Sequence, residues 1–265
     1  MTVYADLIRY RELFGNLFRR DLQAKYRGSL LGVAWTLANP VLLMGVYLLV
    51  FSVLWKTKFG SGGHYSLFLL VGLSAWIFFA TSVQSASRSM LDNANLIRKT
   101  RFPRQLVPLS IVATHLISFA VMLVALLALN FALLPRVRGT EWLAIPIAVG
   151  VVAIASGLAL AIASLDVLFR DIEFLVAALL LPLFFLTPVL YPLNSRDISN
   201  HHKVVEAIHW VNPLSPAIEA LRAPLFYGHL PRLADVLYLV VASIVALALG
   251  AFVFTRVDDQ IAVEV

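Results

Sequence analysis

The sequence predicts an all-α membrane protein with six transmembrane helices, an amphipathic helix before them and short helices ahead of the last span. Composition is the first reason: 60% of the 265 residues are hydrophobic and 14% are charged, whereas a soluble domain carries roughly 25% charged residues. Secondly, the charges cluster between long uncharged runs, and a run of about 20 residues can cross a bilayer. Thirdly, a basic amphipathic stretch precedes the first run. We expect residues 1–265 to form one transmembrane domain.

The amino-terminal stretch, residues 1–28, is expected to lie in the plane of the membrane. At about 100° per residue, the apolar residues of positions 5–24 fall on one face, and the polar residues, including Arg19 and Arg20, fall on the other. A cationic polar face is typical of a helix at the membrane interface. Arg19 and Arg20 are therefore predicted to lie where headgroups of the membrane could bind. Gly28 offers a bend before the chain enters the bilayer.

Six apolar runs are predicted to cross the membrane. They are residues 29–55, 65–87, 106–134, 142–165, 172–191 and 236–255. The first run contains Asn39-Pro40, and a kink is expected there because proline removes a backbone hydrogen bond. Five spans therefore occupy residues 29–191, and the sixth lies with a short tail in residues 232–265.

Lysine and arginine in the loops predict the orientation, because cytoplasmic loops carry an excess of both. They gather before the first span and between the second and third, and these two groups fall on the same side if six spans are correct. They are Arg9, Arg11, Arg19, Arg20, Lys25, Arg27, Arg88, Arg98, Lys99, Arg101 and Arg104. Both termini are therefore predicted to be cytoplasmic. The net charge of +6 is better explained by basic loops facing an anionic leaflet than by nucleic acid, which is not an expected partner.

The motifs that the chain lacks narrow its function. The sequence contains no GxxxxGK[ST] phosphate loop, no HExxH or other metal-ligand cluster, no GxSxG nucleophile elbow and no cysteine. The middles of the first, second, fifth and sixth spans contain no ionisable residue, although ion pathways normally need one. We therefore expect no catalytic site, no metal and no cofactor on this chain. Energy for any transport is expected to come from another subunit.

Two charged segments lie at the predicted cytoplasmic side. Asp166 and Arg170 have the spacing of an ion pair along a helix, although a solvated helix end explains them as well. Within residues 92–105, Asp92 is expected to cap a short helix that has an apolar tip and a basic rim. Such a helix fits a groove of a soluble partner, and contact of its basic residues with lipid headgroups is the alternative.

The longest loop, residues 192–231, is predicted to lie outside the cytoplasm. It contains two short amphipathic or apolar pieces, VVEAIHW and SPAIEALRAPLFY, and each is too short to span the membrane. They are interpreted either as helical turns of an ordinary surface loop or as interfacial helices that form a lid over a pathway.

Aromatic residues are frequent in the first, second and fifth spans. Sugar rings stack on aromatic faces, so a path lined by these residues suits a glycan. Ordinary packing and the aromatic belts of the membrane interface explain any single one of them more simply. The residues are Trp35, Tyr47, Phe51, Trp55, Trp76, Phe78, Phe79, Phe184, Phe185 and Tyr191.

Several stretches together resemble the membrane subunit of type-2 ABC exporters for cell-surface polysaccharides, a family that includes the permeases for O-antigen, capsular polysaccharide and teichoic acid. They occur in the order of the family and cover most of the chain. They are RRDLQAKYRGSLLGVAWTLANP, NLIRKTRFPRQLVPLS, SLDVLFRDIEFLV, FFLTPVLYPL and WVNPLSPAIEALRAPLF. The segments RKTRFP and FRDI are the most telling of these.

The resemblance implies a homodimeric permease in the cell membrane of a bacterium, which pairs with two copies of a separate ATP-binding subunit. ATP and Mg²⁺ would bind to that partner, and this chain would do no covalent chemistry while it moves a lipid-linked glycan. A drug or lipid exporter of the same superfamily, an ion-coupled flippase and a membrane scaffold are the alternatives.

The resemblance also implies roles for individual residues. A coupling helix docking on the ATPase, with the FRDI turn as a second contact, would contain Asn95, Leu96, Ile97, Arg98, Lys99, Arg101, Arg170 and Asp171. Channel aromatics would be Trp35, Tyr47, Phe51, Trp76, Phe79, Phe184, Phe185 and Tyr191. Gate helices at the outer side would contain Trp210, Glu219 and Phe226. Arg19 and Arg20 would lie where headgroups of the membrane, a glycolipid substrate or the ATPase that supplies energy could bind.

Overall fold

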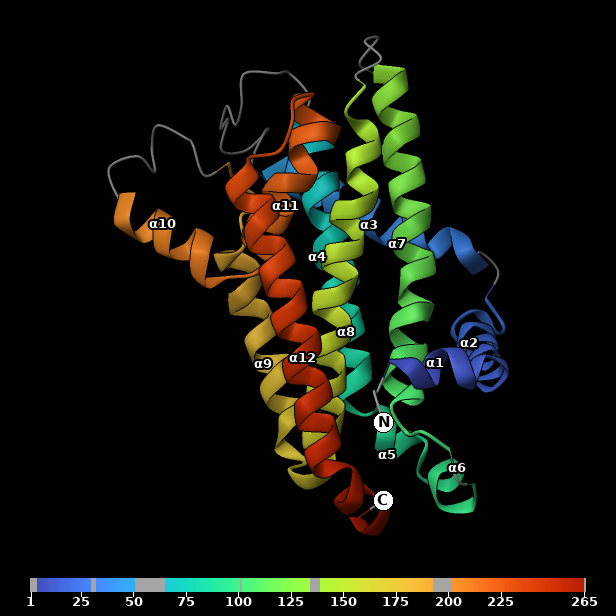
Figure 1. Ribbon diagram of the computed structural model, residues 1–265. Coiled ribbons are helices and arrows are strands. Elements are labelled where there is room, and N and C mark those ends of the chain that lie inside the picture. Colours follow the sequence, from blue (N-terminus) through green and yellow to red (C-terminus); the bar gives the residue numbers. More distant parts are fainter. Residues whose placement is uncertain are drawn as a thin grey trace.

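The computed structural model describes residues 4–29, 32–50, 65–100, 102–133, 139–192 and 202–264, and all regular elements in these ranges are helices. Four helices are long and apolar enough to cross a membrane, and they run side by side (Figure 1). They are α4 (Tyr65–Ser87), α7 (Leu106–Leu133), α8 (Ala144–Leu168) and α12 (Leu233–Glu264), and the 3₁₀ turn η3 (Glu141–Leu143) leads into α8. These four lie where the sequence predicts the second, third, fourth and sixth spans.

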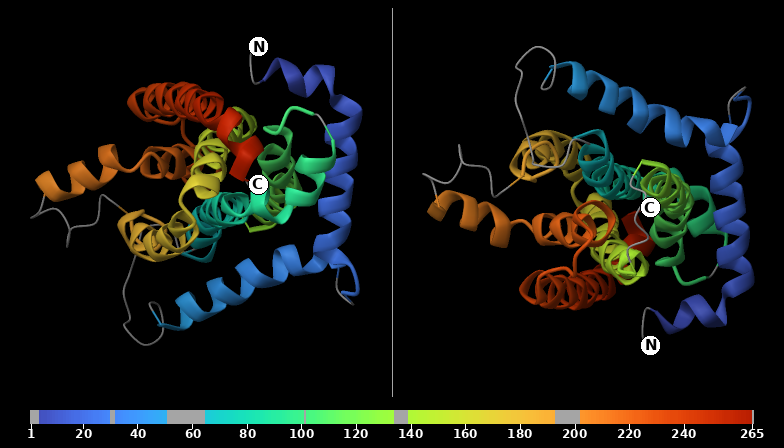
Figure 2. Two further views of the ribbon diagram at one scale, coloured as in Figure 1. Left: turned by 90° about the horizontal axis from the view of Figure 1, so that it is seen from below. Right: turned by 90° about the horizontal axis from the view of Figure 1, so that it is seen from above.

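The first and fifth expected spans are shorter helices. α3 (Trp35–Tyr47) follows the 3₁₀ turn η1 (Gly32–Ala34) and contains Pro40 in its interior. Figure 2 shows α3 lengthwise while the long helices are seen end-on, so α3 lies across the bundle rather than along it. α9 (Asp171–Leu186) runs with the bundle but ends five residues before the predicted end.

The early end of α9 has a local cause. Thr187 adopts an extended conformation, with φ −84° and ψ 135°, and it precedes Pro188. The ring of a proline disfavours the helical conformation of the residue before it. The predicted span to residue 191 was therefore too long.

The amino-terminal stretch forms two helices, α1 (Ala5–Arg9) and α2 (Arg11–Tyr26), where one was expected. α2 lies across one side of the bundle (Figure 2). The expected apolar face is present and packs in one hydrophobic cluster with residues of α7, α8 and α12. Its members in this cluster are Leu7, Tyr10, Leu13, Phe14 and Leu17. The expected bend is present as well, since Gly28 has a positive φ of 74°.

Glycine permits the closest helix contact, between α8 and α12. A Cβ on Gly157 would lie 2.7 Å from the backbone nitrogen of Leu247, and a Cβ on Gly250 would lie 2.8 Å from the carbonyl carbon of Gly157. The two backbones therefore touch directly, as at small-residue crossings in membranes.

The remaining helices are short and lie at the two ends of the bundle. α5 (Ser89–Asp92) and α6 (Ala94–Lys99) lie at the end that also holds the carboxyl terminus, here called the α6 end (Figure 1). α11 (Leu214–Arg222) and the π-helical turn η5 (Ala223–Tyr227) lie at the opposite end, here called the α11 end. α10 (His202–Val211) projects away from the bundle (Figure 2).

Candidate functional site

The predicted docking helix exists as α6, but its start differs from the expectation. Asp92 ends α5 instead of capping α6, and Asn93 separates the two helices. The Asn93 side chain donates to the carbonyl oxygen of Ser89 at 2.8 Å and therefore closes α5. The prediction that Asp92 caps this helix was wrong because the chain forms two short helices rather than one.

One face of α6 is exposed and the other is anchored in the bundle. Asn95, Arg98 and Lys99 are exposed. Ile97 is buried in the cluster that joins α7, α8 and α12, and Leu96 packs at its edge. The expected apolar tip is therefore occupied by the protein's own core, and the exposed surface offers an amide and two cations.

Charged residues connect this end of α4 with the start of α9. The Arg88 guanidinium lies 3.5 Å from the Glu173 carboxylate and 3.7 Å from that of Asp92. Asp166, at the end of α8, accepts the backbone N–H of Glu173 in the first turn of α9 at 2.9 Å. These contacts join the segment after α4, the end of α8 and the start of α9.

The ion pair expected between Asp166 and Arg170 is not formed. α8 ends at Leu168, and Phe169 has an extended backbone with ψ 92°, so the two residues do not share a helix. Arg170 and Asp171, which the FRDI resemblance singles out, are both exposed at the turn between α8 and α9. This turn lies at the α6 end (Figure 1).

Most of the predicted channel aromatics gather in one cluster between α3, α4 and α9. The ring centroid of Phe184 lies 5.4 Å from that of Trp76 and 5.9 Å from that of Tyr47. Phe185 adjoins Phe184 at 5.4 Å, and Phe79 adjoins Trp76 at 6.1 Å. In the single chain Trp76, Phe79 and Phe184 are buried, whereas Phe185 is 58% exposed.

The other predicted aromatics lie apart from this cluster. Tyr191 follows α9, and its hydroxyl donates to the carbonyl oxygen of Phe185 at 3.0 Å. Trp35 is exposed at the start of α3. Phe51, like Arg101 of the predicted coupling segment, lies outside the described residues.

Two of the predicted gate residues, Glu219 and Phe226, lie close to a buried arginine that sequence reasoning did not single out. Arg222 has an exposed fraction of 0%, and its guanidinium donates to the carbonyl oxygens of Pro188 at 2.5 Å and Val189 at 2.7 Å. It also pairs with Glu219 at 2.9 Å. Its Cζ lies 3.5 Å from the ring centroid of Phe68, a cation–π contact. One side chain thus joins α11, α4 and the segment after α9.

The remaining gate residues pack around this arginine or on α10. Phe226 contacts Phe68 edge-on, with ring centroids 5.6 Å apart. Trp210 lies 5.4 Å from Tyr238 of α12, whose hydroxyl donates to the Trp210 carbonyl oxygen. The sequence does contain a signal for Arg222. It is an arginine three residues after a glutamate, in an otherwise apolar segment that is too short to span a membrane.

Arg19 and Arg20 are exposed on the polar face of α2, as the amphipathic pattern predicts. Arg20 pairs with Asp21 at 2.8 Å, and Asp21 also accepts from the hydroxyl of Ser110 on α7. This chain of contacts fixes the rotation of α2 about its own axis.

Comparison with known proteins identifies the family of the chain. The ABC-2 type transporter family matches residues 12–226. An O-antigen export system permease protein RfbA of Myxococcus xanthus is 34% identical over 262 residues, which cover 97% of this chain and 96% of the relative. Two RfbA permeases of Klebsiella pneumoniae are 29% identical over 248 and 251 residues, each covering 92% of this chain and 91% of the relative. The chain belongs to the ABC-2 type transporter family.

Proposed function

We propose that this chain is the membrane permease subunit of an ATP-driven exporter that moves a lipid-linked polysaccharide across the cell membrane of a bacterium. The observation that carries the proposal is the match along nearly the whole chain to permeases named for O-antigen export, at up to 34% identity. The chain contains no phosphate loop, so a separate subunit would bind ATP and Mg²⁺. In this proposal two copies of the chain pair with two copies of that subunit.

α6 is proposed to be the coupling helix that docks on the ATPase. Its exposed residues, Asn95, Arg98 and Lys99, face away from the bundle, while Ile97 fastens the helix to the core. A push on α6 would therefore reach α7, α8 and α12 through packed side chains rather than through a flexible loop. The exposed Arg170 and Asp171 would form the second contact.

The basic residues at the α6 end also support an orientation in the membrane. The α6 end carries Arg98, Lys99 and Arg104, and both termini lie in the same half of the molecule (Figure 1). Cytoplasmic loops are enriched in lysine and arginine. We propose that both termini are cytoplasmic, that α2 lies in the cytoplasmic interface with Arg19 and Arg20 toward lipid headgroups, and that α9 and the predicted first span, residues 29–55, complete six crossings. α3 lies across the bundle (Figure 2), so it would have to tilt toward the long helices to cross the bilayer.

The α11 end would then hold the gate, and the aromatic cluster would border the glycan path. Glycans stack on aromatic rings, and Phe185 is an exposed member of the cluster. The proposed gate, α10 to η5, is held to the bundle by Arg222, and its opening would require the carbonyl contacts of Arg222 to part. The gate and channel roles rest on the family resemblance together with this packing.

The test compares two charge reversals at the α6 end. Lys99→Glu places an acid on the exposed face of α6, and Arg256→Glu places one at an exposed position of α12. With the partner ATPase present, we expect Lys99→Glu to lower surface polysaccharide and polysaccharide-stimulated ATP hydrolysis at least tenfold, and Arg256→Glu to change both less than twofold. Both variants should insert into the membrane at normal levels.

Three outcomes would contradict the proposal. If Lys99→Glu and Arg256→Glu exported the same amount of polysaccharide, α6 would not be the coupling helix. ATP hydrolysis by the purified chain alone would contradict a separate motor. Stimulation of ATPase activity by an apolar drug but not by the lipid-linked glycan would favour a drug or lipid exporter of the same superfamily.

A further inference from the structure

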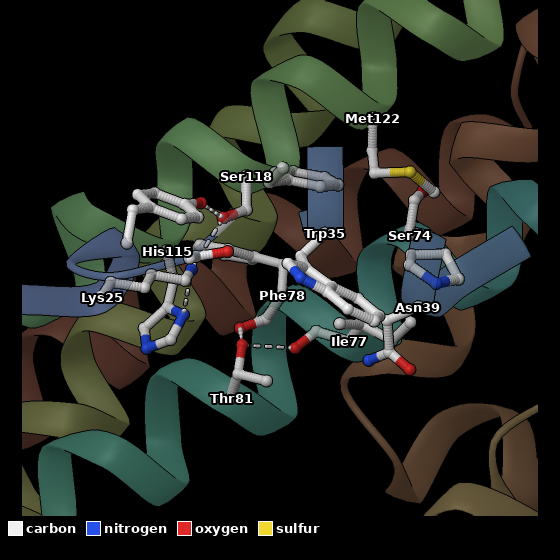
Figure 3. A pocket seen from close by; sticks show the side chains of 14 residues that line it. Lys25, Trp35, Asn39, Ser74, Ile77, Phe78, Thr81, His115, Ser118 and Met122 are labelled. Carbon is white, nitrogen blue, oxygen red and sulfur yellow. Dashed lines mark hydrogen bonds between the residues drawn. The ribbon is translucent and has the colours of Figure 1, made fainter. Parts of the chain in front are cut away.

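A pocket with a volume of about 270 Å³ lies between the end of α2, the start of α3 and the facing sides of α4 and α7. Lys25, His115 and Ser118 lie together at one end of it, and Met122, Ser74 and Asn39 lie at the other, with Trp35 between them (Figure 3). This pocket lies apart from the aromatic cluster around Phe184 and from Arg222. The coupling and gating described above do not use it.

The polar end of the pocket holds a cation without an acidic partner. The Lys25 ammonium donates to the hydroxyl of Ser118 at 2.8 Å and lies 3.4 Å from Nδ1 of His115. An ammonium has three N–H donors, so one remains after these two contacts. Among the described residues that line the pocket none is acidic, and Asp21, one turn earlier on α2, is engaged by Arg20 and Ser110.

Neighbouring polar groups hold Lys25 in position. His115 Nε2 lies 3.1 Å from the hydroxyl of Ser85, and an N–H there would leave Nδ1 as an acceptor for the ammonium. The Tyr26 hydroxyl lies 3.3 Å from that of Ser118. Although the Lys25 side chain keeps an exposed flank, partial burial lowers its pKa below the usual value. An anion beside Lys25 would offset this cost of partial desolvation.

The other end of the pocket is mostly apolar, although the Asn39 amide also lies there (Figure 3). Phe78, Phe119 and Met122 are buried at its base. The hydroxyls of Ser74 and Thr81 donate to carbonyl oxygens within α4, at 2.7 Å each. A sugar, with hydroxyls around its ring, would find the Asn39 amide there but mostly apolar surface otherwise. An amphiphile with an anionic head and an apolar chain matches both ends.

We propose that this pocket binds the phosphate of an anionic membrane lipid, with Lys25 as the charged donor, Ser118 beside it, and the first methylenes of one acyl chain against Phe119 and Met122. Its volume of about 270 Å³ is slightly below the ~300 Å³ at which pockets hold whole small molecules. The pocket therefore suits a headgroup and part of one chain. Such a lipid would join α2 to α3 and α7 at the level where α2 lies across the bundle.

The test uses native mass spectrometry of the purified full-length chain in detergent, titrated with phosphatidylglycerol, with phosphatidylcholine or with inorganic phosphate. Lys25→Gln removes the charge and keeps a polar side chain. Arg27→Gln is the matched control, since Arg27 is exposed two residues further on and does not line the pocket. We expect Lys25→Gln to weaken phosphatidylglycerol binding about tenfold, as for one lost charge-assisted hydrogen bond, and Arg27→Gln less than twofold.

A second variant tests the apolar end with the charge retained. Met122→Trp should fill the base of the pocket and weaken phosphatidylglycerol binding while leaving any binding of inorganic phosphate unchanged. Thermal unfolding without added lipid shows whether each variant is folded. Equal losses in Lys25→Gln and Arg27→Gln would mean non-specific attraction and would overturn the proposal. Equal affinity for inorganic phosphate and phosphatidylglycerol, or for phosphatidylcholine and phosphatidylglycerol, would overturn the anionic-lipid assignment.

Discussion

The direct contact between α8 and α12 predicts that alanine at Gly157 or Gly250 destabilises the protein. A Cβ at Gly157 would lie 2.7 Å from the backbone nitrogen of Leu247, and one at Gly250 would lie 2.8 Å from the carbonyl carbon of Gly157. These neighbours are backbone atoms, so no side-chain rotation relieves the overlap. The two helices must separate, and the packing along both of them is lost in part.

The magnitude follows from two opposing effects. Alanine in place of glycine favours a helix by roughly 0.5–1 kcal/mol, whereas overpacking costs about 1–3 kcal/mol. The net free energy of unfolding should therefore fall by up to about 2.5 kcal/mol. For a chain of this size, that corresponds to a midpoint of thermal unfolding lower by up to roughly 10 °C.

The assay is thermal unfolding of the purified protein in detergent, with Gly15→Ala and Gly45→Ala as controls. A Cβ at either control position meets nothing within 4 Å, and both glycines are helical. The controls should unfold at the same temperature as the original protein or slightly higher. If Gly157→Ala and Gly15→Ala unfolded at the same temperature, the close approach of α8 and α12 would be refuted.

Three further outcomes follow from other contacts. Gly72→Ala should destabilise the chain by about 1–3 kcal/mol, seen as a lower unfolding temperature, because its Cβ would lie 2.7 Å from the Arg222 guanidinium. Glu219→Gln should cost roughly 3–5 kcal/mol in the same assay, since it leaves the buried Arg222 charge unpaired. Burial raises the pKa of Tyr4 to about 12, and the protonated hydroxyl donates to Leu247. The stability from this contact is present below the ordinary pKa and lost as pH rises through about 12. All eight tyrosines contribute to absorbance at 295 nm, so Tyr4→Phe should remove one tyrosine's share of the change near that pH.

The sequence predicted the helices whose ends are marked by composition. The second span was predicted at residues 65–87, and α4 occupies Tyr65–Ser87 because uniform hydropathy stops at the basic loop. The amphipathic face of α2 also followed from its periodicity. Predictions were wrong where one backbone residue decides the end of a helix, as at Thr187, whose conformation follows from the next residue rather than from hydropathy.

Contacts between distant segments could not be predicted in this way. The carbonyl groups of Pro188 and Val189 receive hydrogen bonds from Arg222, which lies more than thirty residues further along the chain. Periodicity places a residue on a face of its own helix but does not identify the backbone that the face meets. The same reason explains why Trp76 and Phe184 were each predicted as aromatics of interest, but not as neighbours.

Contacts at both ends of the bundle join α4 to α9. At the α6 end, Arg88 follows α4 and contacts Glu173 in the first turn of α9. At the α11 end, Arg222 stacks on Phe68 near the start of α4 and binds the carbonyl oxygens just after α9. Because both ends are joined, a displacement of α4 at one end would draw α9 with it. A movement that begins at α6 would therefore reach the α11 end through these two helices without bending either of them, and the buried arginine would be the contact at which that movement is either transmitted or released.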